Sequence, residues 1–213
     1  MDGKRCRRQR GITLSAVALG VIGLAGCASS RVESSSTGAA TSASGTDSAT
    51  VVNARNALVT MADLLPGWRA VGLPRETIIC GQPNPLASEP RGTAAANFFY
   101  GPLNTLSLFE RITVTDVPQA KTDFHAEQQA AHACRTWHFA GSDYSISDVN
   151  APPVGDESFT VRLTGRLPFE ATWIRVGDVN IKVETGGNVT DAEQQHNVSL
   201  ALHKVVTNKR PLG

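Results

Sequence analysis

The amino-acid sequence predicts an α+β fold, in which an antiparallel β-sheet is covered by two main helices, for a single domain that spans residues 51–213. Candidate strands follow one another through tight turns, which favours antiparallel pairing. Helical segments come once in the middle of this strand order and once at its end, and this order indicates a sheet that is covered on one face. About 160 residues suffice for one domain with its own apolar core.

The first 26 residues have the layout of an export signal. A cluster of five basic residues precedes an apolar run of 13 residues, 12–24. The basic residues are Lys4, Arg5, Arg7, Arg8 and Arg10. A helix that crosses a ~30 Å hydrocarbon core needs roughly 20 predominantly apolar residues, so the run is typical of a signal peptide and not of a permanent span. Because basic residues stay on the cytoplasmic side, we expect the rest of the chain to be extracytoplasmic.

The segment Leu24-Ala25-Gly26-Cys27 follows the apolar run. It resembles the lipobox of bacterial lipoproteins, which is a leucine, two small residues and a cysteine. The resemblance implies that the chain is cleaved between Gly26 and Cys27, that Cys27 carries diacylglycerol, and that the protein is anchored to the outer face of the cytoplasmic membrane. Two acyl chains give stable attachment, whereas one is marginal. An ordinary secretory signal with an incidental cysteine, or an uncleaved anchor, is the alternative.

Residues 27–50 comprise the lipidated cysteine and a linker rich in Ser, Thr, Ala and Gly, a composition typical of a flexible tether. Loss of the signal takes five basic residues and Asp2 from totals of 20 and 19, which leaves a net charge of −3. A mildly acidic chain without a basic stripe has no electrostatic footprint for nucleic acid. The expected partners are therefore the membrane, through the lipid anchor, and an envelope lipid or protein.

Two cysteines, Cys80 and Cys134, remain once Cys6 has left with the signal and Cys27 has been lipidated. In an oxidising compartment an even remainder indicates a disulfide. Two buried free thiols and a metal-binding pair are the alternatives. Neither cysteine has a second Cys or a His at zinc-ligand spacing, so we expect neither a metal nor a cofactor.

The first half of the domain contains a short helical turn and a pair of strands. Thr60 and Asp63 have capping-box spacing and open the turn. The strands are expected at residues 97–100 and 105–117, on either side of a turn at Gly101-Pro102.

Glu110 falls on the apolar parity of the second of these strands. We expect a β-bulge to rotate it outward; the alternative is that it points at a polar group inside. After this strand, Pro118 is expected as the first residue of a helix that runs to about Cys134, because a proline at that position loses no helical hydrogen bond.

The second half is mostly β, with a final helix. The expected strands are 144–149, 158–163, 169–176 and 179–185. Gly177-Asp178 is a two-residue hairpin signal between the last two strands. Thr190 and Glu193 form a capping box that opens the final helix, whose buried stripe includes Val198, Leu202 and Val205.

No sequence motif of enzyme chemistry is present: there is no Gly-x-Ser-x-Gly elbow, His-Glu-x-x-His helix, phosphate-binding loop or dinucleotide fingerprint. We therefore expect a protein that is not an enzyme and has no catalytic residues. Six aromatic residues could line an apolar ligand pocket: Trp68, Phe98, Phe99, Trp137, Phe169 and Trp173. Four of them, Trp68, Phe98, Trp137 and Trp173, are the candidate ligand-binding residues. The alternative is that they fill the core.

Several short motifs are similar to those of actinobacterial, especially mycobacterial, lipoproteins. They are residues 58–68, Cys80-Gly81, the helix that ends at Cys134, and residues 154–158 and 175–179. The domain of these lipoproteins is similar to the extracellular sensor domains of bacterial receptor serine/threonine kinases. The resemblance implies an antiparallel sheet with helices and a ligand cleft. The resulting hypothesis is a non-catalytic, sensor-like module for a lipid or cell-wall ligand, and the alternative is a protein-docking or structural accessory of an envelope complex.

Overall fold

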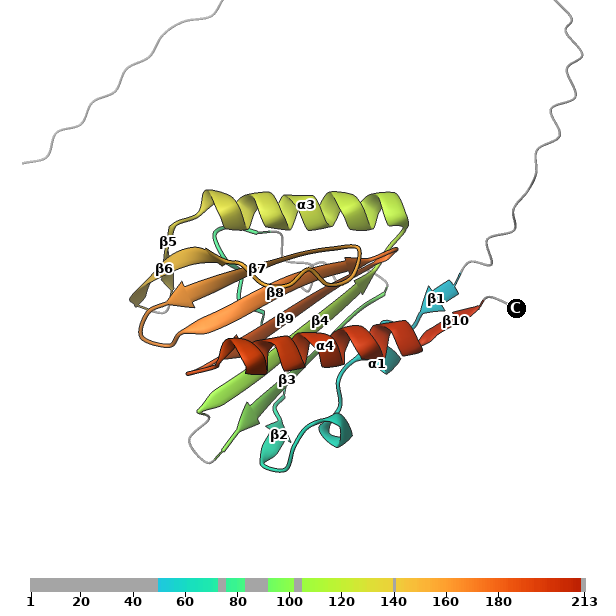
Figure 1. Ribbon diagram of the computed structural model, residues 1–213, viewed down its shortest axis with the longest axis horizontal. Coiled ribbons are helices and arrows are strands. Elements are labelled where there is room, and N and C mark those ends of the chain that lie inside the picture. The colour runs from blue at the N-terminus through green and yellow to red at the C-terminus, as the bar shows by residue number, and fades with distance from the viewer. Residues whose placement is uncertain (1–49, 73–75, 83–91, 102–104, 140, 212–213) are drawn as a thin grey trace, which may run out of the picture. The chain divides into compact units, whose positions relative to one another are not determined.

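The computed structural model describes residues 50–72, 76–82, 92–101, 105–139 and 141–211 (Figure 1). Eight antiparallel strands form the main sheet, in the order β2-β3-β4-β9-β8-β7-β6-β5. Their bounds are β2 (Trp68–Ala70), β3 (Thr93–Tyr100), β4 (Leu106–Val114), β5 (Thr136–Phe139), β6 (Ser142–Val149), β7 (Glu157–Thr164), β8 (Phe169–Val176) and β9 (Val179–Gly186). The expected α+β fold with an antiparallel sheet is confirmed.

Helices and one small sheet complete the domain. They are α1 (Ala54–Ala57), the 3-10 turn η1 (Met61–Asp63), α3 (Val117–Ala133), α4 (Asp191–Thr207), and the pair β1 (Thr50–Val52) and β10 (Lys209–Pro211). None of the helices in the described part of the chain is long and apolar enough to cross a membrane.

The two long helices cover opposite faces of the sheet, and not one face as the order of elements suggested. Along β9, Val179, Ile181 and Val183 belong to the core that contains α1 and α4, and α4 crosses in front of the strands in Figure 1. Trp173 on β8 belongs to a second core, beneath α3. Since side chains alternate along a strand, a strand that is buried at nearly every position must be covered on both sides.

Capping interactions set the starts of the long helices. The Asp116 carboxylate accepts a hydrogen bond of 2.7 Å from the Gln119 N–H, so α3 begins at Val117, one residue before Pro118. At α4, the Glu193 N–H donates to the Thr190 hydroxyl over 3.2 Å, and the Glu193 carboxylate accepts from the Thr190 N–H over 2.8 Å. This reciprocal capping box is the one expected from the sequence.

Glu110 is not rotated outward by a bulge. The register of β3, β4 and β9 runs through it without interruption, with Ala96 and Val183 as its cross-strand partners. Its side chain therefore points into the α4-side core, where Oε2 accepts a hydrogen bond of 2.7 Å from the Val59 N–H. The segment after α1 supplies a backbone donor that would otherwise lack a partner, and this donor explains why a carboxylate is tolerated on an apolar face.

The expected disulfide is formed between Cys80 and Cys134, whose Cα atoms lie 6.0 Å apart. It ties residues 76–82 to the end of α3. The Gly/Pro-rich loop that follows Cys80 lies mostly outside the described residues.

Candidate functional site

The structure separates the four aromatic residues that the sequence singled out. Phe98 is buried in the core beneath α4, and Trp68 packs against that core. Trp173 is buried in the core beneath α3, and Trp137 packs against it. With two on each face of the sheet, the four cannot line one cavity. Gly26 and Cys27 lie outside the described residues.

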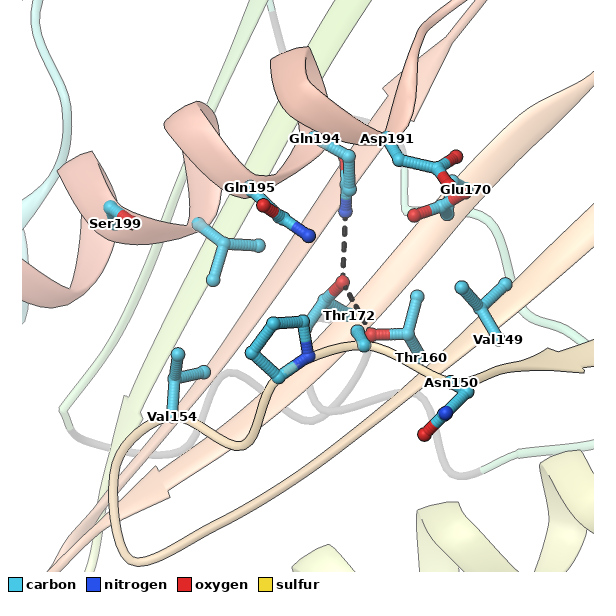
Figure 2. Close-up of a pocket in the computed structure, with 13 residues that line it drawn as sticks. Val149, Asn150, Val154, Thr160, Glu170, Thr172, Asp191, Gln194, Gln195 and Ser199 are labelled. Carbon is cyan, nitrogen blue, oxygen red and sulfur yellow. Dashed lines mark hydrogen bonds between the residues drawn. The ribbon is translucent and has the colours of Figure 1, made fainter.

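A first pocket, which we call the polar pocket, lies between α4 and the loop that joins β6 to β7 (Figure 2). Its volume is about 130 Å³. Thr160 of β7 and Thr172 of β8 lie on the sheet side of the pocket, and their two hydroxyl oxygens are 3.0 Å apart. Gln194 of α4 lies on the helix side. The Gln194 amide donates to the Thr172 hydroxyl over 2.9 Å. The pocket therefore combines uncharged polar groups and aliphatic walls with the carboxylates of Glu170 and Asp191.

A second hollow lies beside Trp68, with a volume of about 240 Å³. The Trp68 and Tyr100 rings pack at a centroid distance of 5.5 Å on its wall. Two carboxylates on the wall are already engaged: Asp63 pairs with Lys204 over 2.9 Å, and Glu193 caps α4. Of the four candidate ligand-binding residues, Trp68 lines this hollow. None of the four lines the polar pocket or the third hollow, which is described next.

The third hollow, the aromatic pocket, lies on the α3 face at the ends of the strands, with a volume of about 250 Å³. Five rings line it, and no residue of α3 does. They are Phe99, Phe109, Phe139, Tyr144 and Phe169. Its rim is apolar and open to solvent, because Phe139 is 48% exposed and Leu167 is 70% exposed.

The register of the sheet explains why there is a cavity. Phe99 pairs with Ser107, Ser107 pairs with Gly186, and Gly186 pairs with Phe169, so one row crosses β3, β4, β9 and β8. The two middle residues are small and the two outer residues are large, which leaves a space between the rings. Gly187 also lines the pocket and has a φ of +100°, which favours glycine. A Cβ atom at this position would also collide with the Thr105 carbonyl oxygen.

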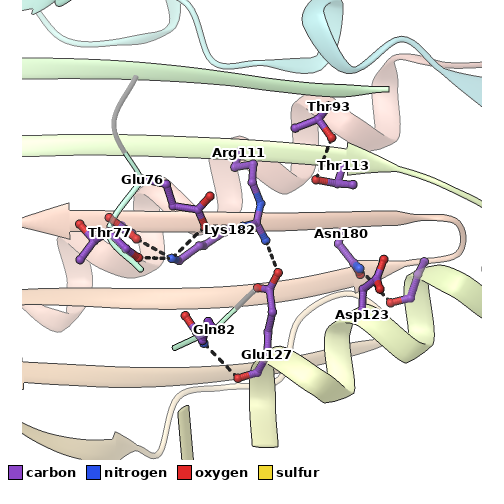
Figure 3. Close-up of polar contacts among 12 residues, drawn as sticks. Glu76, Thr77, Gln82, Thr93, Arg111, Thr113, Asp123, Glu127, Asn180 and Lys182 are labelled. Atoms are coloured by element: carbon purple, nitrogen blue, oxygen red, sulfur yellow. Dashed lines mark hydrogen bonds and ion pairs between the residues drawn. The ribbon is translucent and has the colours of Figure 1, made fainter. Parts of the chain in front are cut away.

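A cluster of buried charges lies next to the aromatic pocket and connects the sheet to α3 and to residues 76–82 (Figure 3). Arg111 of β4 forms an ion pair with Glu76 and another, at 2.6 Å, with Glu127 of α3. Lys182 of β9 contacts Glu76 at 3.1 Å and Glu184 at 2.7 Å. Since charges of both signs are paired, the cluster can stay in a dry interior.

Lys182 has no donor left for a ligand. Besides its two carboxylate contacts, its ammonium donates to the Thr77 carbonyl over 2.9 Å and lies 4.8 Å from the centre of the Trp173 ring. Burial raises the pKa of Glu184, against the opposing effect of the Lys182 ammonium. Burial thus favours the uncharged form of the carboxyl that Glu184 contributes to the lining of the aromatic pocket.

Three of the histidines each pair with one carboxylate near the surface: His125 with Glu157 at 3.2 Å, and His132 and His138 with aspartates at 2.7 Å. Among the described residues no group of three or more His, Cys, Asp or Glu side chains could hold a metal ion.

The chain matches no protein-family model and no curated protein. Among solved structures it is similar to the extracellular domain of PknH from Mycobacterium tuberculosis, with a TM-score of 0.46 and 11% identity over 54% of this chain and 64% of that one. It is also similar to a protein from Bacteroides thetaiotaomicron, with a TM-score of 0.31 and 8% identity over 69% of this chain and 42% of that one. It thus spans less than two thirds of the length of either protein.

Proposed function

We propose that the chain is an extracytoplasmic lipoprotein, anchored through Cys27, whose folded domain is a non-catalytic module that binds an apolar part of an envelope molecule in the aromatic pocket. The observation that carries this proposal is the cavity of about 250 Å³ that five aromatic rings surround. Ligand sites in proteins are mostly apolar hollows with few polar groups. A hollow that opens through an exposed apolar rim fits an acyl chain or a ring better than a charged group.

The size of the pocket limits the ligand. Pockets that bury a drug-sized molecule measure roughly 300 to 1,000 Å³, and the aromatic pocket lies just below that range. It therefore accepts one end of a chain or a single ring, while the rest of the ligand stays outside. A lipid of the membrane that holds the anchor would satisfy this condition.

The decisive variant is Ser107→Leu, which adds bulk at the centre of the row of small residues. Titration calorimetry with 1-octanol on the chain from residue 28 to 213, prepared without lipid, should show binding with a negative heat-capacity change. Ser107→Leu should abolish this binding. Val117→Asp is the control, because Val117 is 52% exposed on α3 and lines none of the three hollows. Equal binding by Ser107→Leu and the control would disprove the assignment.

Protein docking is the second candidate function, and the exposure of Phe139 and Leu167 at the rim is the observation that favours it. Two measurements separate the two functions. If the domain docks a protein, Leu167→Asp abolishes a protein contact in cross-linked envelopes, and octanol does not bind to the unaltered chain. In ligand binding, octanol binds to the unaltered chain, and native mass spectrometry after incubation with an envelope lipid extract shows a discrete added mass.

A further inference from the structure

We propose that the polar pocket is a second binding site, which takes an uncharged secondary amide with a small apolar substituent, such as an acetamido group. It lies on the α4 face of the sheet, opposite the aromatic pocket, and the proposal does not depend on what the aromatic pocket binds. Its volume of about 130 Å³ suits one functional group and not a whole ligand.

Gln194 leaves one hydrogen-bond acceptor unused in the pocket wall. The residue is 2% exposed, and its Nε2 atom donates to the Thr172 hydroxyl over 2.9 Å and to the Val183 carbonyl over 3.4 Å. Its Oε1 atom is buried and has no partner among the residues that the structure describes. Buried polar atoms of side chains are normally hydrogen-bonded. Since Gln194 lines the pocket, we infer that a ligand there supplies the missing donor.

The threonine pair leaves one donor unused. Thr160 and Thr172 share a single hydrogen bond of 3.0 Å, in which either hydroxyl can be the donor. The pair has two hydroxyl hydrogens and this bond uses one of them. Within the described part of the chain, no acceptor takes the other, because the remaining contact of Thr172 is with Gln194 as donor. Whichever threonine donates to its neighbour, the pair offers one hydrogen to a ligand.

One free acceptor and one free donor match a secondary amide, whose N–H donates and whose carbonyl accepts. The aliphatic walls leave room for a methyl group beside it. They come from Val149, Ala151, Pro152, Val154 and Val198. The two carboxylates at one end of the pocket, Glu170 and Asp191, do not need a charged ligand, because both already pair with Arg162.

The test is saturation-transfer NMR on the full lipidated chain in nanodiscs, with three probes at equal concentration. N-acetylglucosamine and N-acetylalanine methylamide carry the acetamido group on a sugar and on a peptide, and glucose carries hydroxyls alone. We expect the strongest saturation at the acetyl methyl of at least one amide probe, and that probe identifies the sugar or the peptide as the source. Equal saturation of glucose, or none of either amide, overturns the proposal.

Two variants and a matched control assign the binding to the pocket. Thr160→Val combined with Thr172→Val removes both hydroxyls, and with them the hydrogen that the pair offers, without a change of shape, and should weaken binding about tenfold, the loss expected for one hydrogen bond. Ser199→Trp places a large ring at the mouth from an exposed helix position and should block binding without disturbing the core. Thr113→Val alters a second cross-strand threonine pair, Thr93 and Thr113, far along the sheet, and should leave binding unchanged. Unchanged binding by both pocket variants disproves the site.

Discussion

Replacing Glu110 with glutamine should stabilise the domain at neutral and alkaline pH and leave it unchanged in acid. The Glu110 side chain is fully buried beneath the segment that follows α1. One carboxylate oxygen accepts from the Val59 N–H, and the other has no partner among the described residues. Burial raises the pKa of Glu110 from 4.5 to about 7, only partly opposed by the Val59 hydrogen bond.

The magnitude follows from this difference in pKa. One pKa unit corresponds to about 1.4 kcal/mol, so the difference of about 2.5 units between the folded and the unfolded chain is worth about 3 kcal/mol. Between pH 4.5 and 7 the folded chain keeps a proton that the unfolded chain has lost, so the free energy of unfolding falls as pH rises through this window. Glutamine keeps an acceptor for the Val59 N–H and does not ionise.

Thermal unfolding followed by circular dichroism from pH 4.5 to pH 8 measures the effect. Below pH 5 the E110Q variant and the unaltered chain should melt together. At pH 8 the variant should melt higher by roughly 6 to 12 °C, since each kcal/mol shifts the midpoint of a domain of this size by about 2 to 4 °C. E193Q is the control of opposite sign, because the hydrogen bonds from Thr190 lower the pKa of Glu193 and its contribution is lost as pH falls. An advantage of E110Q that is the same at every pH would refute the reasoning.

Two further predictions concern the cysteines. Cys27→Ala should release the protein from membranes or leave an uncleaved precursor, measured by membrane fractionation and mass spectrometry, and unchanged cleavage and lipid labelling would disprove the anchor. Replacing both Cys80 and Cys134 with serine should lower the free energy of unfolding by about 4 kcal/mol in the chain-entropy model for 54 residues of separation, measured in guanidinium; a loss below ~1 kcal/mol would show that the bond is not a structural constraint.

The elements that the sequence predicted well are those with strong local signals. Gly177-Asp178 lies between β8, which ends at Val176, and β9, which starts at Val179, as a two-residue turn requires. The capping box at Thr190 and Glu193 likewise opens α4 where it was expected. Turns and caps depend on residues a few positions apart, so one sequence contains the whole signal.

The features that the sequence missed depend on partners far along the chain. The three-residue strand β1 pairs with β10 at the other end of the domain, and neither has a periodic pattern long enough to detect. The position of Glu110 depends in the same way on the Val59 N–H, 51 residues earlier. The assignment of α3 and α4 to opposite faces required the register of the sheet, because both faces of β9 are buried.

The aromatic pocket was predicted only in part, for the same reason. Phe99 and Phe169 were among the six aromatic residues that could line a pocket, but Trp173 fills a core, and the cavity arises where Ser107 and Gly186 are neighbours on adjacent strands. Small residues 79 positions apart carry no signal until the pairing of β4 with β9 is known. Side chains alternate along a strand, so Glu184 and Lys182 of β9 lie on the same side of it. A carboxylate and a lysine two residues apart in a buried strand are a signal that the sequence does contain.

Residues 76–82 connect the disulfide to the aromatic pocket. Cys80 fastens this segment to the end of α3, Glu76 pairs with Arg111 and Lys182 on the sheet, and Thr77 lines the pocket while its carbonyl accepts from Lys182. The buried ion pairs alone are a weak source of stability, because desolvation offsets their attraction. The covalent bond therefore holds the ionic contacts in place, and the wall of the pocket depends on a bond that persists outside the reducing cytosol. The polar pocket, which has no residue from this segment, should not share this dependence.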